Sequence, residues 1–92
     1  LVEGQGLSTW VVHNRRPGIT IDFTKETRFE VPPVVFAQGI RSAICVPMML
    51  GEEIFGVFIG HSREVKEFSR RDVSFRQTLA NQAAVTIKNS MN

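Results

Sequence analysis

The stretch Gly39–Gly60, GIRSAICVPMMLGEEIFGVFIG, decides the fold of this chain. It contains two apolar runs, Arg41–Leu50 and Ile54–Ser62, which are joined by Gly51-Glu52-Glu53. Ile, Val and Phe favour strands, and glycine accepts the positive φ that a tight turn requires. The stretch therefore predicts a β-hairpin.

Each predicted strand is apolar on both faces. A strand with one face in water alternates apolar and polar residues, whereas the first strand places Ile44, Val46, Met48 and Leu50 on one face and Ala43, Cys45 and Met49 on the other. Both faces must therefore be covered. Pro47 cannot donate to a ladder, so we expect it at a bulge or an unpaired position. Because two strands alone are marginally stable, further strands are expected from an additional N-terminal part or from a second copy.

The sequence on either side of the hairpin predicts helices and one more strand. Residues 7–15 have helical apolar spacing and end before Pro17-Gly18. Ile19–Phe23 alternates apolar and polar residues, which predicts a short strand, and residues 24–38 predict a connection with a helical turn or two. Ser69 and Asp72 predict a capping box for a helix that ends near Asn89. These elements together predict an antiparallel sheet with helices packed on it.

The composition is that of one small globular domain of 92 residues, with 42% hydrophobic and 22% charged residues. A formal net charge of +2 is too balanced to predict binding to nucleic acid. No apolar run approaches the roughly 20 residues that span a bilayer, and Leu1–Gly4 has no feature of a signal peptide. We therefore expect a cytoplasmic protein whose segment 1–92 makes no contact with a membrane.

Residue types that carry catalysis or bind metals are few and scattered. Cys45 is the only cysteine, which excludes an internal disulfide and a multi-thiolate metal site. It lies inside a predicted strand, where a cysteine acts as a small hydrophobic residue. His13 and His61 are far apart and belong to no ligand pattern. The sequence predicts no catalytic residue, no metal site and no enzymatic activity for this segment.

Several motifs together resemble the second half of a GAF domain. Gly4–Val12 (GQGLSTWVV) resembles the G-x-G-L-x-x-W-V motif of that family, and Asp22 with Arg28-Phe29 resembles its D-x-x-x-D-x-R-F loop. Gly39–Pro47 resembles the G-I-R-S…V-P strand, and Phe68–Ala84 resembles the F-S-x-x-D…L-A-x-Q-A-A final helix. The likeness extends over nearly the whole chain, which is similar to roughly the C-terminal 60% of a GAF domain.

The resemblance implies an α+β fold with an antiparallel GAF-like (PAS-like) sheet flanked by helices. It implies that residues 1–92 are a single partial domain, from which the N-terminal helix and the first strands are missing. In GAF domains the terminal helices cover one face of the sheet and a ligand pocket lies on the other. This arrangement accounts for strands that are apolar on both sides. The helix at about 68–91 would lead to an output domain.

By resemblance, the chain is expected to be a small-ligand-sensing regulatory module of a bacterial signal-transduction protein, most similar in role to those of sensor histidine kinases. It would relay a conformational change through its last helix and form a homodimer through helices or by strand exchange. The alternative is a degenerate GAF domain that dimerises and relays without a ligand. The bulky side chains of Phe29, Val34, Val35 and Phe36 keep this alternative open, since they could fill a pocket.

The positions that match the family's pocket give six candidate ligand-binding residues: Asp22, Arg28, Phe29, Phe36, Ile40 and Arg41. The ligand is not predicted, and nothing indicates haem or a metal. Cyclic-nucleotide-binding members carry an N-K…F…D-E set, but Ser62-Arg63 stands here in place of Asn-Lys and Val73 in place of Glu. Bilin-binding members use a cysteine commonly followed by His, whereas Cys45 precedes Val46. Free methionine sulfoxide reductases use several cysteines, and Cys45 has no resolving partner.

Overall fold

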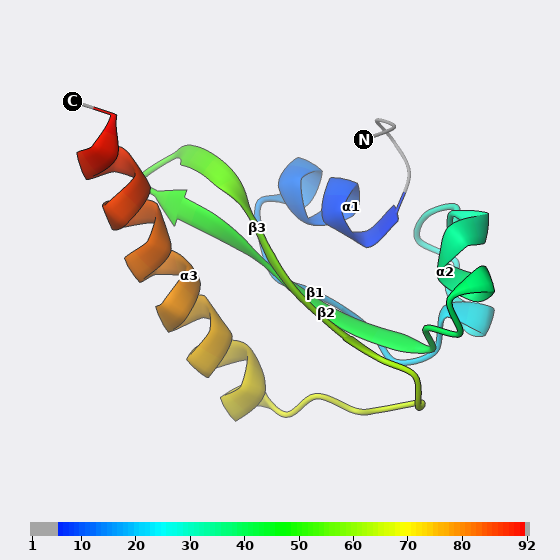
Figure 1. Cartoon of the computed structure of the whole chain (residues 1–92). Helices are drawn as coiled ribbons and strands as arrows, with labels where there is room; N and C mark the ends of the chain where they lie inside the picture. Colours follow the sequence, from blue (N-terminus) through cyan, green and yellow to red (C-terminus); the bar gives the residue numbers. More distant parts are fainter. Residues whose placement is uncertain (1–5, 92) are drawn as a thin grey trace.

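The structure, a computed structural model, describes residues 6–91 (Figure 1). In chain order this part contains helix α1 (Gly6–Asn14), strand β1 (Gly18–Thr20), the 3₁₀ helix η1 (Phe23–Lys25), helix α2 (Pro33–Ala37), strands β2 (Ser42–Leu50) and β3 (Glu53–Ser62), and helix α3 (Arg70–Ser90). The strands form one antiparallel sheet in the order β1-β2-β3. The predicted α+β fold is confirmed.

Strands β2 and β3 form the hairpin that the sequence predicts, and β2 is the central strand of the described sheet. Gly51 has a φ of 62° in the turn. The register is continuous from Ser42 to Met48 and shifts between Met48 and Met49. Pro47 lies one residue before this irregularity, and β1 reaches only as far as the position opposite Cys45. No strand of the described sheet therefore flanks Pro47 on the β1 side, which suits a residue without an N–H group.

Both faces of β2 are covered, which explains its apolar residues at odd and even positions. Ala43 and Cys45 are fully buried in a cluster that includes residues of α1. Ile44 and Val46 have the opposite parity, are equally buried, and belong to the face that α3 covers. The two helices lie on opposite sides of the hairpin (Figure 1).

The segment before the hairpin differs from the sequence prediction in one place. The predicted helix 7–15 is confirmed as α1, but the strand predicted for Ile19–Phe23 is only Gly18–Thr20. The strand ends early because the Asp22 carboxylate accepts a hydrogen bond from the Thr24 N–H at 3.0 Å and caps η1. The expected helical turns of the connection are η1 and α2.

Helix α3 begins with the predicted capping box. The Ser69 hydroxyl accepts a hydrogen bond from the Asp72 N–H at 3.1 Å, and the Asp72 carboxylate accepts one from the Ser69 N–H at 2.9 Å. Ala80 and Ala84 are fully buried, so small side chains let the helix approach the sheet closely. Within residues 6–91, no helix combines the length and the apolar character needed to cross a membrane.

Candidate ligand-binding site

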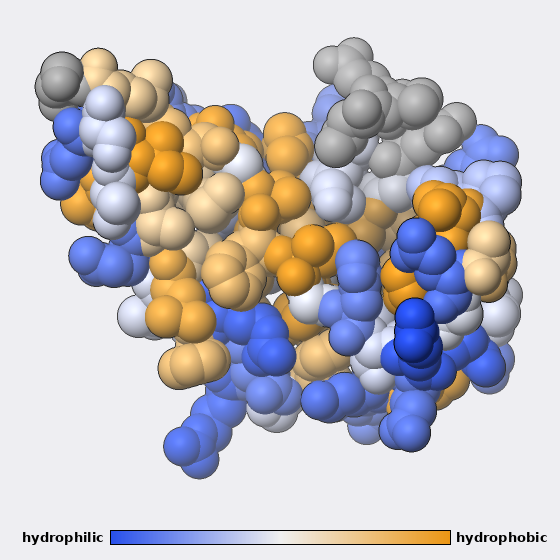
Figure 2. All heavy atoms as spheres, in the orientation of Figure 1, coloured by the Kyte–Doolittle hydropathy of each residue, from blue (hydrophilic) through white to orange (hydrophobic). Residues whose placement is uncertain are grey.

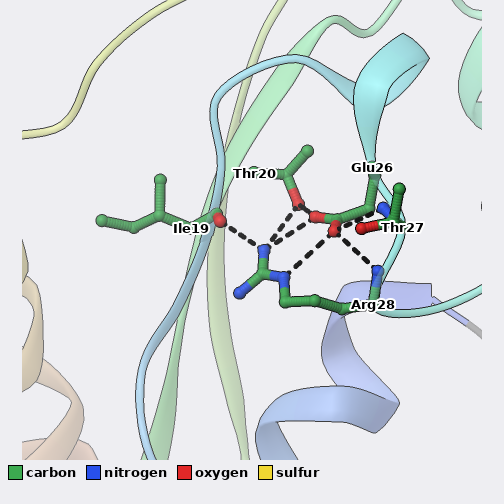
Figure 3. Close-up of polar contacts among 5 residues, drawn as sticks. All are labelled: Ile19, Thr20, Glu26, Thr27 and Arg28. Atoms are coloured by element: carbon green, nitrogen blue, oxygen red, sulfur yellow. Dashed lines mark hydrogen bonds and ion pairs between the residues drawn. The ribbon is translucent and has the colours of Figure 1, made fainter.

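A polar cluster attaches the loop after η1 to β1 and α1. The Glu26 carboxylate accepts hydrogen bonds from Thr20 Oγ1 at 2.6 Å, and from Arg28 Nε at 3.0 Å and Nη2 at 2.7 Å. Arg28 Nη2 also donates to the backbone carbonyl of Ile19 on β1. Figure 3 shows the guanidinium group between the carboxylate and the strand. The Glu26–Arg28 ion pair thus closes the 26–28 loop and holds it against the sheet.

The environment of Glu26 keeps its carboxyl ionised. Burial is the largest single influence and favours the neutral form. This effect is outweighed by the hydrogen bonds from the side chains of Arg28 and Thr20, by the hydrogen bond from the Arg28 N–H and by the charge of Arg28. Together they lower the pKa of Glu26 to about 2. The same hydrogen bond from Arg28 to Glu26 raises the pKa of Arg28. Both groups remain charged near neutral pH.

This pKa predicts a pH dependence of stability. The pKa of Glu26 is about 2 in the folded chain, lower than its ordinary value of 4.5. The ionised carboxyl therefore stabilises the fold at pH values above 4.5, and this stabilisation is lost as the pH falls towards about 2. We expect the Tm of wild type to fall more steeply between about pH 5 and pH 2 than that of Glu26→Gln. Glu67→Gln, at an exposed position, is the control and should follow wild type. Thermal unfolding by circular dichroism measures the slopes, and equal slopes for Glu26→Gln and wild type would contradict the role of Glu26.

Arg28 also stacks on the chain's single tryptophan. Its guanidinium carbon lies 4.7 Å from the centroid of the Trp10 ring, and that of Arg16 lies 5.5 Å from the same ring. Cation–π contacts of this kind favour a fixed position for the indole. Arg28 therefore joins three parts of the fold: the loop, β1 and α1.

Two hollows flank this cluster. The larger, of about 590 Å³, lies between α1 and the loop, and its walls include Thr9, Trp10, Val12, His13, Arg28 and Phe29. Thr9 Oγ1 is buried and has no hydrogen-bond partner within the part of the chain that the structure describes. A smaller hollow of about 390 Å³ lies between β1 and the loop, beside Asp22, Glu26 and Arg28. The larger volume lies in the range of small-molecule sites.

A second ion pair joins the start of η1 to the segment before β2. Arg41 Nη2 lies 3.3 Å from Asp22 Oδ2, and the Phe23 N–H donates to the Arg41 carbonyl at 2.7 Å. Hydrogen bonds from Thr24 and then the contact with Arg41 lower the pKa of Asp22. Arg41 Nε is buried and has no acceptor among residues 6–91, so it keeps one unused donor.

The six sequence-predicted residues do not line one common pocket. Asp22 and Arg28 border the smaller hollow, and Arg28 and Phe29 border the larger one. Phe29 packs against the core cluster, and Ile40 is part of it. Phe36 leaves 47% of its surface exposed on α2. Of the six, only Asp22 and Arg41 contact each other directly through polar side-chain atoms in the described structure.

Three residues of the site were missed by sequence reasoning: Trp10, Thr20 and Glu26. Trp10 lies within the apolar spacing that predicts the helix at 7–15, yet the Arg28 guanidinium lies over its ring. The signal for Glu26 was its position two residues before Arg28, a spacing that lets one carboxylate accept from both the backbone and the side chain of that arginine. Thr20 gave no signal, because only the antiparallel sheet brings its hydroxyl to the loop.

Cys45 lies away from both hollows, in the centre of β2. It is fully buried, and burial raises the pKa of its thiol to about 11. A neutral, inaccessible thiol is a poor nucleophile. Among residues 6–91, no group of three or more His, Cys, Asp or Glu residues is arranged to hold a metal ion.

Comparisons with known proteins agree with the fold. The GAF structure of a phosphoenolpyruvate-protein phosphotransferase from Coxiella burnetii is 21% identical, with a TM-score of 0.85 over 99% of this chain and 54% of its own. A type II free methionine-R-sulfoxide reductase from Thermoplasma acidophilum is 21% identical, with a TM-score of 0.76 over 91% of this chain and 57% of its own. A domain assigned to a two-component sensor histidine kinase from Sinorhizobium meliloti is 17% identical, with a TM-score of 0.70 over 80% of this chain and 52% of its own.

The chain thus spans little more than half the length of these structures. A search of curated proteins finds no match. The family model of the GAF domain matches residues 1–87, which is nearly the whole sequence and includes each motif quoted above. GAF domains serve as signalling and ligand-sensing modules in sensor kinases and other proteins. The chain belongs to the GAF domain family.

Proposed function

We propose that the chain is the ligand-sensing module of a bacterial signal-transduction protein, most simply a cytoplasmic sensor histidine kinase. The observation that carries the proposal is the hollow beside Arg28, whose walls combine the aromatic Trp10 and Phe29 with the Thr9 hydroxyl, which has no hydrogen-bond partner among residues 6–91. Aromatic walls with a few polar groups are typical of small-molecule sites. The similar fold of the Sinorhizobium meliloti domain supports the choice of parent protein. The ligand is a small molecule whose class is left open.

A continuous set of contacts leads from this hollow to α3. Arg28 donates to Ile19 of β1, and Ile19 pairs with Ile44 of β2. The Pro47 carbonyl of β2 accepts a hydrogen bond from Gln77 Nε2 of α3 at 2.9 Å. A ligand that moves Arg28 would displace β1 first and α3 last. We propose that α3 passes the change to an output domain and that the module acts as a homodimer.

One observation favours the alternative, a GAF domain that relays without a ligand. Phe29, Val31 and Val35 pack against the buried cluster on the α1 face of the sheet. Apolar side chains packed on this face are what a GAF domain whose pocket is filled by its own residues would require. In this alternative the larger hollow remains a surface feature, while the route of contacts from Arg28 through β1 and β2 to α3 keeps its role.

The sensing proposal predicts that the purified chain retains a small molecule. Native mass spectrometry of protein prepared without added ligand should show an additional mass on wild type. Val12→Glu, which places a carboxylate in the wall of the larger hollow, should lose this mass. Val34→Glu is the matched control, because Val34 is 55% exposed on α2 and lies outside the described hollows. Bare protein in all three samples would favour the relay alternative, and retention by Val12→Glu would exclude this hollow.

A further inference from the structure

Two serine side chains hold the chain at the point where it leaves β3. Ser42 and Ser62 lie directly opposite each other in the ladder of β2 and β3. The Ser42 hydroxyl donates to the Glu64 carbonyl at 2.7 Å, and the Ser62 hydroxyl accepts a hydrogen bond from the Glu64 N–H at 3.1 Å. Both backbone polar groups of Glu64 are therefore fixed by this pair, which we call the serine clamp (Ser42 and Ser62).

The serine clamp directs the chain towards α3. Ser42 is fully buried and has the same parity as Ile44, so its side chain lies on the face of β2 that α3 covers. Directly opposed residues of an antiparallel pair share a face, which places Ser62 there as well. From the clamp, residues 63–69 run to α3 without helix or strand (Figure 1). We call this segment the strap, and it ends at Ser69, the N-cap of α3.

The first residue of the strap is also attached to the end of α2. Arg63 Nε donates to the Gln38 carbonyl at 3.2 Å, and Gln38 is the C-cap of α2. Beside this contact, the Arg41 N–H donates to the Ser62 carbonyl at 2.8 Å. Two hydrogen bonds therefore connect the segment that follows α2 to the junction of β3 and the strap.

Helix α2 is held to the core by little apolar surface. It has five residues, none of which is buried in the described structure. Val34 and Phe36 are 55% and 47% exposed, and Figure 2 shows apolar surface over α2 at the right of the view. Segments with few buried contacts open more readily than core strands. Helix α2 is therefore free to shift while the serine clamp, anchored by the buried Ser42, stays in place.

We propose that α2 controls the start of α3 through the contact between Arg63 and Gln38, with Arg63 and Ser42 as positioning residues. While the Gln38 carbonyl accepts from Arg63, the strap is fixed at two neighbouring points, which are this contact and the serine clamp at Glu64. When α2 shifts, the contact with Arg63 is lost and the strap turns about Glu64. The first turn of α3 then loosens, because its N-cap Ser69 lies at the far end of the strap.

This route is separate from the one that leads through Arg28, β1 and β2. It begins at α2 and requires no ligand in the larger hollow, so it goes beyond both readings of the function. Any contact that displaces α2 would change α3 without passing through Arg28. The Ser62-Arg63 pair, which departs from the Asn-Lys of cyclic-nucleotide-binding members, has a role of its own in this route.

Two glycines allow a matched perturbation of the two ends of the hairpin. Gly39, which follows α2, has a φ of 72°, and Gly51, in the turn between β2 and β3, has a φ of 62°. Apart from its chain neighbours, a Cβ atom at either position would meet no atom within 4 Å. Alanine therefore brings similar backbone strain at both positions without a clash. Gly39→Ala strains the end of α2, whereas Gly51→Ala strains the opposite end of the hairpin.

Amide hydrogen exchange, followed residue by residue by NMR on the full chain without added ligand, tests the proposal. The reporters are the N–H groups of Asp72 and Val73, which are hydrogen-bonded within the first turn of α3. Gly39→Ala should speed their exchange by about 3-fold or more, because it displaces the end of α2. Gly51→Ala should leave their exchange close to that of wild type.

Arg63→Met provides a second way to break the contact. It keeps the apolar part of the side chain but removes the donor to Gln38, so its effect on the reporters should match that of Gly39→Ala. Loss of a positive charge before a helix would by itself stabilise the helix and slow the exchange. The double variant of Gly39→Ala and Arg63→Met should exchange no faster than either single variant, because the contact is already lost.

Three results would each overturn the proposal. They are equal exchange of the reporters in the two glycine variants, unchanged exchange in Arg63→Met, and additive effects in the double variant. None of them bears on the additional mass that the sensing proposal predicts, so the two proposals fail separately.

Discussion

Replacement of Ile44 by alanine should lower the free energy of unfolding by about 2–5 kcal/mol. Ile44 is fully buried at the centre of β2, beside Gly60 of β3 and on the face that α3 covers. The variant loses the burial of the side chain and leaves a cavity, because neither the central strand nor the closely packed helix can move in freely. In a domain of this size, such a loss is a large part of the total stability.

The urea midpoint of unfolding measures this effect, with Ile59→Ala as the matched control. Ile59 has the same side chain in the neighbouring strand, but it is 38% exposed. Its replacement should cost less, about 1 kcal/mol, because only part of the side chain is removed from a packed environment. Equal losses for the two variants would show that α3 does not pack over Ile44 as described.

Replacement of Arg28 by alanine should be the most damaging change in the loop, at about 3 kcal/mol. The Glu26 side chain is only 6% exposed, so the variant leaves a nearly buried carboxylate without its partner. The stacking of Arg28 on Trp10 is lost as well. We take the lower end of the range for buried pairs because the Arg28 side chain is itself 35% exposed.

A double-mutant cycle separates the ion pair from the other contacts of Arg28. Glu26→Gln combined with Arg28→Ala should be less damaging than the sum of the two single changes, because the double variant has no unpaired carboxylate. Urea unfolding of the four proteins gives the coupling energy. Additive losses would show that the two side chains act independently.

The sequence predicted most of the fold because its strongest signals are local. The hairpin depends on β-branched and aromatic runs joined at Gly51, and α3 depends on the capping box of Ser69 and Asp72. Both signals lie within short segments, and both elements are confirmed. The shortened β1 is the exception. There the side chain of Asp22 competes with the strand for backbone hydrogen bonds. The alternation of apolar and polar residues does not indicate this competition.

The candidate site was less predictable because its contacts join residues far apart in the chain. Arg28 was singled out, but its partners Trp10 and Thr20 come from α1 and β1 and reach it only in the folded sheet. Phe36 was grouped with Phe29 as an apolar residue of one segment. The two differ because Phe29 faces the core, whereas Phe36 is half exposed on α2.

Both functional readings require that a change at Arg28 reach α3, and hydrogen exchange tests this claim most directly. Amide exchange of wild type should be compared with Arg28→Lys, which keeps the charge but loses the planar fork, and with Ile40→Val, a core change of modest cost in the same region. The account predicts faster exchange in Arg28→Lys both in the loop and in α3 around Gln77–Ala84, and no such change in α3 for Ile40→Val. Exchange that changes only in the loop and α1, with α3 like wild type, would contradict it.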